Sequence, residues 1–189
     1  MCGRVVQKTP LGEIRVLFET VNPIPNAAPT FNGAPTDTLP VVRLDRDGRR
    51  SLDLLRWGLV PWWAKDIKMG VRCINAMAET VASKPAFRDA FARGQRCIVP
   101  VDAFYEWKKI GASKQPYAIV GADGLPLALA GLWERWEESG RDARGQPRDT
   151  LLHEPLLPAP YAGFALAGVR GHCVHGQPWC RRVDHGAQR

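Results

Sequence analysis

Short runs of apolar residues, separated by turn-forming residues, occupy most of the first 136 positions. Residues 39–44 and 52–55 are apolar runs on either side of Asp45-Arg46-Asp47-Gly48, a composition that predicts a β-hairpin. Five later runs are also expected to be strands. These runs are residues 72–76, 97–101, 103–107, 117–120 and 127–136.

Two segments carry helix signals instead. Thr9-Pro10 is typical of an N-cap followed by proline in the first turn, and apolar residues recur at helical spacing over residues 11–18. Ser83 is expected to begin a second helix that ends at Gly94. The prolines between residues 22 and 35 predict irregular structure. Many short strands with few helices favour the α+β class: one domain with a curled, mainly antiparallel β-sheet and short flanking helices.

Composition indicates the size of the core and the cellular compartment of this domain. A chain of 189 residues with 45% hydrophobic residues is long enough for one core. It has no signal peptide and no apolar run near the ~20 residues of a membrane span, so we expect a cytoplasmic protein without a membrane partner. We also expect a monomer. The five cysteines are scattered, which favours free thiols over disulfides.

Positive charge is concentrated in the first part of the chain. The formal net charge is +7, and residues 1–136 hold 19 Lys and Arg against 13 Asp and Glu. Such a balance suits a nucleic-acid partner, although solubility alone also explains it.

The remainder of the chain has a different composition. Residues 137–189 contain no Lys, Ile or Asn but hold all four histidines. The spacing of His and Cys over residues 172–185 matches no standard zinc pattern, so no metal site and no cofactor are expected. We expect a domain over residues 1–150 and a divergent, poorly ordered tail over residues 151–189.

Cys2 is the residue with the most distinctive chemistry. If Met1 is removed, Cys2 carries a free α-amine beside its thiol. The amine can condense with an aldehyde to an imine, and the thiol can then close a thiazolidine ring on the same carbon. Both groups ionise close enough to neutral pH for this chemistry. The alternative is that a cysteine follows Met1 by accident of composition.

Asn75 and Glu106 are candidate helpers for such a reaction. The Asn75 amide can hydrogen-bond a sugar hydroxyl or an imine precursor, although Asn also commonly stabilises turns. Glu106 stands among Phe104, Tyr105 and Trp107. Desolvation by these rings would favour its protonated form and suit it to proton transfer. Strand alternation equally allows Glu106 to point away from Tyr105 and Trp107 into water.

A third group mixes aromatic and basic side chains. Trp faces stack on unpaired bases while Lys and Arg contact phosphates, which is the usual combination for binding single-stranded nucleic acid. The alternative is that the tryptophans belong to the core, and we expect this of Trp57. The group comprises Arg56, Trp57, Trp62, Trp63, Lys65 and Lys68.

These features together resemble the SRAP family, the SOS-response-associated, abasic-site-processing proteins. Six blocks carry the resemblance in the same order, over residues 1–136. They are Met1-Cys2-Gly3-Arg4, Phe31-Asn32-Gly33-Ala34-Pro35-Thr36, Arg56-Trp57-Gly58-Leu59-Val60-Pro61-Trp62-Trp63, Ile74-Asn75-Ala76-Met77-Ala78-Glu79-Thr80, Pro85-Ala86-Phe87 and Phe104-Tyr105-Glu106-Trp107.

The resemblance implies a defined reaction in the DNA damage response. The N-terminal cysteine, Cys2, would capture the aldehyde of an abasic site in single-stranded DNA as a stable thiazolidine. Asn75 would contact the lesion and Glu106 would act as the catalytic glutamate. A peptidase activity is also ascribed to the family, explained by self-removal of residues ahead of the cysteine. Arg4, Trp62 and Trp63 would line the DNA groove.

Two departures from the family pattern stand out. Met77 replaces the usual Arg, which removes one phosphate contact and is expected to weaken DNA binding without abolishing it. The later His-Asp-Arg-Met-Pro-like block with its catalytic histidine has no counterpart here, since Glu154-Pro155 follows His153. The resemblance ends near Thr150, and the composition of the tail suggests the hypothesis of a shifted reading frame.

Three functional classes remain open from the sequence. The first is covalent capture of DNA lesions through Cys2. The second is a noncovalent single-stranded DNA-binding module, and the third is a cysteine autopeptidase. Cys73 and Cys97 lie in apolar strand contexts with no early histidine, so we expect them in the core rather than as nucleophiles.

Overall fold

A computed structural model describes residues 3–137, 148–153 and 169–173. Five of its strands form a small closed barrel in the order β3-β4-β9-β8-β5. Neighbouring barrel strands are antiparallel except β4 and β9, which run parallel. The barrel strands are β3 (Thr38–Leu44), β4 (Arg50–Trp57), β5 (Arg96–Val101), β8 (Leu127–Trp136) and β9 (Arg148–His153).

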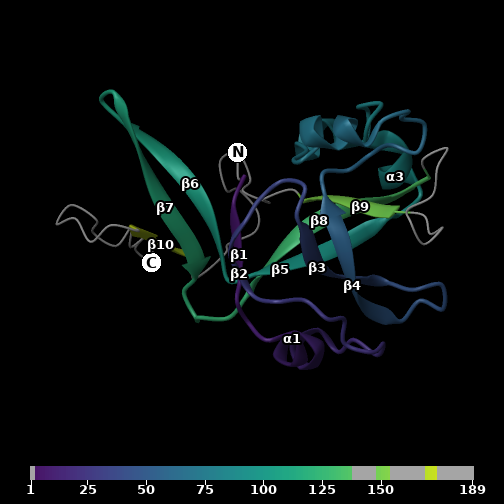
Figure 1. Ribbon diagram of the computed structural model, residues 1–189, viewed down its shortest axis with the longest axis horizontal. Coiled ribbons are helices and arrows are strands. Elements are labelled where there is room, and N and C mark those ends of the chain that lie inside the picture. Colours follow the sequence, from purple (N-terminus) through teal and green to yellow (C-terminus); the bar gives the residue numbers. More distant parts are fainter. Residues whose placement is uncertain (1–2, 138–147, 154–168, 174–189) are drawn as a thin grey trace, which may run out of the picture.

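A second sheet adjoins the barrel and is antiparallel throughout. Its order is β10-β7-β6-β1-β2. The long strands β6 and β7 extend away from the barrel as an arm (Figure 1). The strands of this sheet are β1 (Val5–Gln7), β2 (Thr30–Gly33), β6 (Ala103–Ile110), β7 (Ser113–Gly121) and β10 (Val169–Cys173).

The helices are few and short, as the α+β prediction requires. The prediction of a curled, mainly antiparallel sheet is confirmed by the closed barrel and its antiparallel neighbour. The four helical elements are α1 (Leu11–Phe18), the 3₁₀ helix η1 (Ile67–Arg72), α2 (Ala78–Val81) and α3 (Arg88–Ala92). The predicted hairpin corresponds to β3 and β4, and the predicted strand over residues 127–136 matches β8.

Several local predictions were wrong for identifiable reasons. The N-cap of α1 is Pro10 rather than Thr9, because the first helical N–H groups, of Glu13 and Ile14, donate to the Pro10 carbonyl. Thr9 is held outside the helix, where its hydroxyl donates to Asp102 Oδ1 at 2.6 Å. The second helix begins at Arg88 rather than near Ser83, whose hydroxyl donates back to the Thr80 carbonyl. Such local side-chain bonds compete with helix capping.

Two further segments also differ from the prediction. Residues 30–33, expected to be irregular, form β2 because β1 supplies a pairing partner, with Thr30 opposite Gln7. Residues 73–76, expected to be a strand, form a loop after η1. The Leu59 N–H donates to the Cys73 carbonyl at 3.0 Å, and this contact holds the loop against the chain that leaves β4.

The main hydrophobic core joins the two sheets. Trp57, fully buried, packs with Val5 of β1 and Phe104 of β6 as well as with barrel residues. The interpretation of Trp57 as a core residue is therefore confirmed. The other members of this cluster are Leu39, Val41, Leu55, Val99, Val101 and Leu129.

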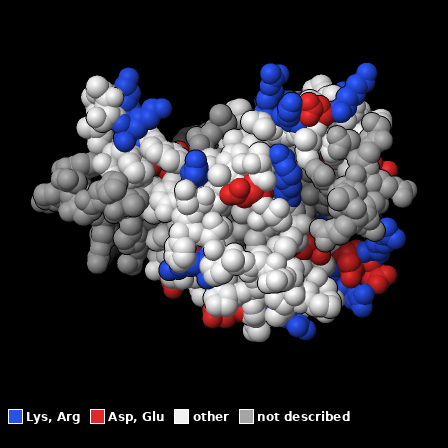
Figure 2. Space-filling model, viewed as in Figure 1, with Lys and Arg blue, Asp and Glu red and all other residues white. Residues whose placement is uncertain are grey.

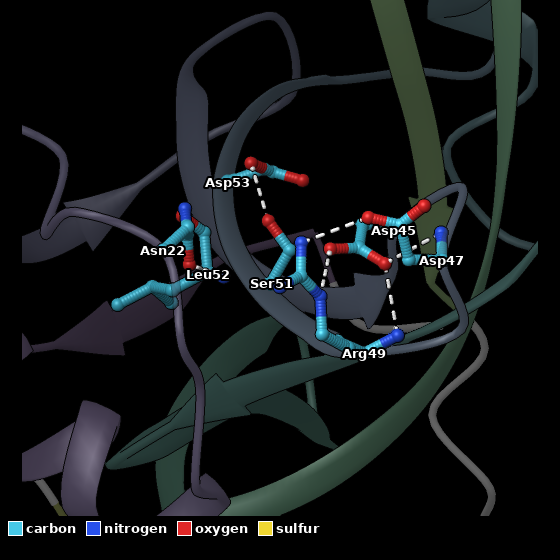
Figure 3. A network of polar contacts seen from close by, with 7 residues as sticks. All are labelled: Asn22, Asp45, Asp47, Arg49, Ser51, Leu52 and Asp53. Atoms are coloured by element: carbon cyan, nitrogen blue, oxygen red, sulfur yellow. Dashed lines mark hydrogen bonds and ion pairs between the residues drawn. The ribbon is translucent and has the colours of Figure 1, made fainter.

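The turn between β3 and β4 is held by its own polar groups (Figure 3). Asp45 Oδ1 accepts from the backbone N–H of Asp47 at 2.9 Å and of Arg49 at 2.8 Å. These contacts, led by the Arg49 backbone hydrogen bond, lower the pKa of Asp45. Nearby, the side-chain amide of Asn22 bonds both the N–H and the carbonyl of Leu52, so it substitutes for a strand partner along β4.

Gly58 and Gly70 allow η1 to approach the end of β4. A Cβ on Gly70 would lie 2.5 Å from the Gly58 carbonyl oxygen, and Gly58 itself has a φ of +116°. A side chain at either position would push η1, and the loop that follows it, away from the barrel.

We expect Gly70→Ala to lower the free energy of unfolding by about 1–3 kcal/mol, because the new methyl group meets backbone atoms that cannot move aside. Urea denaturation measures the change. Gly12→Ala is the matched control, since nothing lies within 4 Å of its added Cβ in α1. That variant should be neutral or more stable by up to about 1 kcal/mol. Equal stability of the Gly70→Ala variant and the parent protein would contradict the packing argument.

An ion pair attaches the end of α3 to β8. Arg93 Nη2 lies 2.7 Å from Oε2 of Glu134, whose side chain is only 3% exposed. Burial raises the pKa of Glu134 above its ordinary value, and the charge of Arg93 compensates for this only in part. Arg93 therefore reduces the cost of ionising the buried Glu134 carboxyl.

Arg93→Ala should lower the free energy of unfolding by about 1–3 kcal/mol at pH 8, where Glu134 is left buried and ionised. The loss should shrink at pH 4, below the ordinary Glu pKa of 4.5, because Glu134 is then largely protonated in both the folded and the unfolded state. Denaturation at the two pH values measures the difference. Arg88→Ala, which removes only an exposed pair with Asp89, should stay within about 0.5 kcal/mol. A loss that is independent of pH would argue against the role of Glu134.

Candidate functional site

The pairing of β1 with β6 brings the beginning of the described chain beside Glu106. Val5 lies opposite Phe104, and the Tyr105 N–H donates to the Arg4 carbonyl at 2.9 Å. Continuing this antiparallel register sets Gly3 opposite Glu106. Cys2 lies outside the described residues.

Glu106 faces the barrel side of β6. The rings of Tyr105 and Trp107 contact each other, with centroids 6.4 Å apart, so these two residues share the other face of the strand. Alternation then sets Glu106 on the face of buried Phe104. Glu106 is half-buried there, so it is neither enclosed by the two rings nor fully in water.

Asn75 lies in the loop that follows η1, and two contacts hold this loop. The Trp57 indole N–H donates to the Ile74 carbonyl at 2.9 Å, and Ile74 packs on the core cluster that includes Val5 and Phe104. Asn75 is half-buried, whereas Met77 is 54% exposed. The Asn75 loop, β1 and β6 therefore meet over one shared cluster of core residues.

Arg4 points to the outer face of the same sheet. Its guanidinium donates to the Asn32 side chain at 3.0 Å, and its backbone faces Tyr105. The Tyr105 hydroxyl in turn donates to the Phe31 carbonyl at 3.4 Å. Alternation along β1 and β6 thus sets the side chains of Arg4 and Glu106 on opposite faces of the sheet.

Trp62 and Trp63 are exposed by 56% and 42%, unlike Trp57. The Trp62 indole N–H donates to Asp89 Oδ2 of α3 at 2.9 Å, a contact that lowers the pKa of Asp89. This contact links Trp62 to the helical segment, which comprises η1, α2 and α3, whereas Glu106 and the Asn75 loop meet at β1 and β6.

Trp62 also lines a polar hollow on the barrel that sequence reasoning missed. The Arg43 guanidinium lies 4.3 Å over the ring of Trp133 and bonds Asp53 at 2.7 Å. Glu134 lines the same hollow. These residues come from β3, β4 and β8, and no local motif connects strands so far apart in sequence.

Figure 2 shows basic side chains at the outer end of the β6–β7 arm and over the helical segment. Further basic side chains lie between these two places and along the lower part of the molecule, where acidic side chains accompany them. A polyanion lying across this face would therefore meet positive charge at several places.

Cys73 and Cys97 are buried free cysteines, as predicted. Burial raises the pKa of Cys73 and raises that of Cys97 to about 12. Both thiols are therefore protonated at neutral pH, which makes them poor nucleophiles.

The described part of the chain holds neither a metal-binding cluster nor a helix that could span a membrane. Within residues 3–137 and the two later strands, no group of His, Cys, Asp and Glu is arranged to hold a metal ion. The His and Cys side chains over residues 172–185, considered as zinc ligands, lie outside the described part. None of the described helices has the length and apolarity to cross a membrane.

Comparison with known proteins agrees with the fold. The SOS response associated peptidase (SRAP) family model matches residues 1–152. A protein from Bordetella bronchiseptica superimposes with a TM-score of 0.66 at 28% identity, covering 81% of this chain and 71% of that one. A protein from Bacteroides thetaiotaomicron gives a TM-score of 0.69 at 22% identity, covering 81% and 67%, which supports the fold alone.

Relatives with curated names are abasic site processing proteins. YoaM of Bacillus subtilis is 40% identical over 139 residues, which cover 72% of this chain and 60% of YoaM. HMCES of Gallus gallus is 39% identical over 101 residues, covering 48% and 30%. This chain thus spans about 60% of the length of the Bacillus relatives it matches. The family match over residues 1–152 shows that the chain belongs to the SRAP family.

Proposed function

We propose that this protein captures abasic sites in single-stranded DNA covalently, through Cys2 exposed by removal of Met1. The observation that carries the proposal is the pairing of β1 with β6. When its register is continued from Val5 toward the start of the chain, the residues just after Cys2 lie opposite Glu106. Family membership and the names of the relatives support a role in processing abasic sites. We also propose that the protein acts as a monomer in the cytoplasm, associated with damaged DNA in the SOS response.

The proposed reaction is a condensation that releases one water. The Cys2 amine attacks the aldehyde carbon of the ring-opened sugar to give a carbinolamine. Protonation of its hydroxyl group expels water and leaves an imine. The Cys2 thiolate then attacks the imine carbon, the nitrogen takes up a proton, and a thiazolidine links protein to DNA.

Glu106 suits the proton transfers of this sequence. A half-buried carboxyl can donate a proton to the departing hydroxyl group and accept one from the thiol. We propose that Asn75 hydrogen-bonds the opened sugar and orients its aldehyde. The anchoring of its loop by Trp57 supports this role, because a fixed amide loses little entropy when it binds.

Cys2 is the preferred nucleophile on electrostatic grounds as well. Burial holds the thiols of Cys73 and Cys97 in their protonated forms. An amine beside the thiol is also needed to form the ring, and an internal cysteine has none. The third family helper, the later histidine, has no counterpart block, so we propose that capture is more efficient than release.

The DNA path is proposed to use exposed aromatic and basic side chains. Trp62 and Trp63 offer rings for stacking with unpaired bases. We propose that Arg4 contacts a phosphate at the outer edge of β1. The exposed Met77 stands where the family has Arg, so this chain is proposed to bind DNA with one fewer phosphate contact.

Cys2→Ala should abolish covalent capture. Protein freed of Met1 is incubated with abasic single-stranded DNA, intact single-stranded DNA and a peptide, and denaturing gels follow the products. We expect a heat-stable adduct with abasic DNA alone, absent from Cys2→Ala and retained by Cys97→Ala. Equal native-gel binding of both DNAs without an adduct would instead support a noncovalent module. Peptide cleavage that depends on Cys2 would support an autopeptidase.

Glu106→Gln should slow adduct formation by about 10²-fold, because the amide keeps the shape of the side chain but cannot shuttle protons. Single-turnover rates at saturating abasic DNA measure the effect, and binding of intact DNA should be unchanged. Glu13→Gln, on exposed α1, removes the same charge and is the matched control. A Glu106→Gln rate within twofold of the parent rate would exclude Glu106 as the proton donor.

A further inference from the structure

The outer end of the β6–β7 arm is strongly basic. Lys108, Lys109 and Lys114 are all exposed, and residues 107–122 contain no Asp or Glu. Figure 2 shows basic side chains at this end of the arm without acidic neighbours in that view. The charge therefore lies at the end of a projection rather than on the body of the domain (Figure 1).

The arrangement of two of these lysines is unfavourable for the arm itself. Lys109 lies directly opposite Lys114 in the antiparallel register, so both side chains are on the same face. Like charges in such a pair repel each other and destabilise a hairpin. Strand β10 pairs with β7 only over Tyr117–Gly121 among the described strands, so this repulsion falls on a two-stranded ribbon. A bound anion between the two ammonium groups would remove the penalty.

The lysine pair continues the face that carries the aromatic residues of β6. Alternation sets Tyr105, Trp107 and Lys109 on one face of the strand. Trp107 is 42% exposed and contacts Tyr105. Lys109 lies three positions after Glu106, which corresponds to about 10 Å along a strand. The Glu106 side chain is on the opposite face, so an unpaired strand that leaves it would cross the edge of β6 and then meet the exposed ring of Trp107 and the lysine pair.

We propose that Lys109 and Lys114 bind backbone phosphates of the single-stranded DNA that flanks the lesion, a few nucleotides from it. The commitment to single-stranded DNA follows from the exposed ring of Trp107 on the face of the lysine pair, because stacking requires unpaired bases. This inference rests on the proposed function in that the flank is defined relative to the captured site. The arm then strengthens DNA binding and sets the direction in which the bound strand runs. The chemical step does not depend on the arm.

The test compares Lys109→Gln/Lys114→Gln with the parent protein. Lys8→Gln/Arg15→Gln is the matched control, since both residues are exposed and lie at or before α1, away from the arm. Fluorescence anisotropy measures binding of intact single-stranded DNA over a salt series. Adduct formation is followed with abasic DNA carrying long flanks, and with abasic DNA trimmed to one nucleotide on each side.

The arm variant should bind long intact DNA three- to tenfold more weakly at low salt. Its slope of log affinity against log salt should fall by about 1.4, which corresponds to two phosphate contacts on a single strand. The maximal adduct rate should be unchanged, and the trimmed substrate should not distinguish the variant from the parent. The control variant should match the parent in all of these measurements.

Two results would overturn the inference. They are an unchanged salt slope on intact DNA and an equal loss on trimmed DNA. Absence of an adduct in the parent protein would refute covalent capture instead. The anisotropy series on intact DNA would still decide whether the lysine pair binds phosphates.

Discussion

The pairing of β1 with β6 is the contact on which the rest of the candidate site depends. Val5 and Phe104 lie opposite each other and are both buried in the cluster that joins the barrel to the second sheet. Because their side chains are fixed in this core, the register of the two strands cannot slip by one residue without exposing both. The same register determines which residue faces the start of the chain and which side of β6 carries Glu106.

The loop with Asn75 depends on the same core from the opposite direction. Trp57 fills the cluster with its ring and uses its indole N–H to hold the Ile74 carbonyl. The close approach of Gly58 and Gly70 brings η1 against the end of β4 and so sets where this loop begins. Burial and hydrogen bonding therefore act together to hold the Asn75 loop rigidly beside β1 and β6.

The buried thiols and the basic side chains occupy different parts of the domain. The thiols of Cys73 and Cys97 are buried and protonated, which leaves the interior inert. Basic side chains lie outside, on the arm and over the helical segment (Figure 2). The opposed pair of Lys109 and Lys114 costs the arm stability, and such a local cost is typical of residues selected for a partner rather than for folding.

The sequence by itself determined the family, the hairpin of β3 and β4, strand β8 and the buried state of Trp57, because each rests on a local pattern or on a run of matching blocks. Tertiary structure decided the rest. Residues 30–33 became a strand only because β1 offers a partner, and Thr9 lies outside helix α1, where its hydroxyl bonds Asp102, far along the chain. The face of Glu106, the separation of Trp62 from β6 and the opposition of the two arm lysines likewise depend on strand register. Register follows from which side chains share a core, and a sequence pattern taken alone does not specify that.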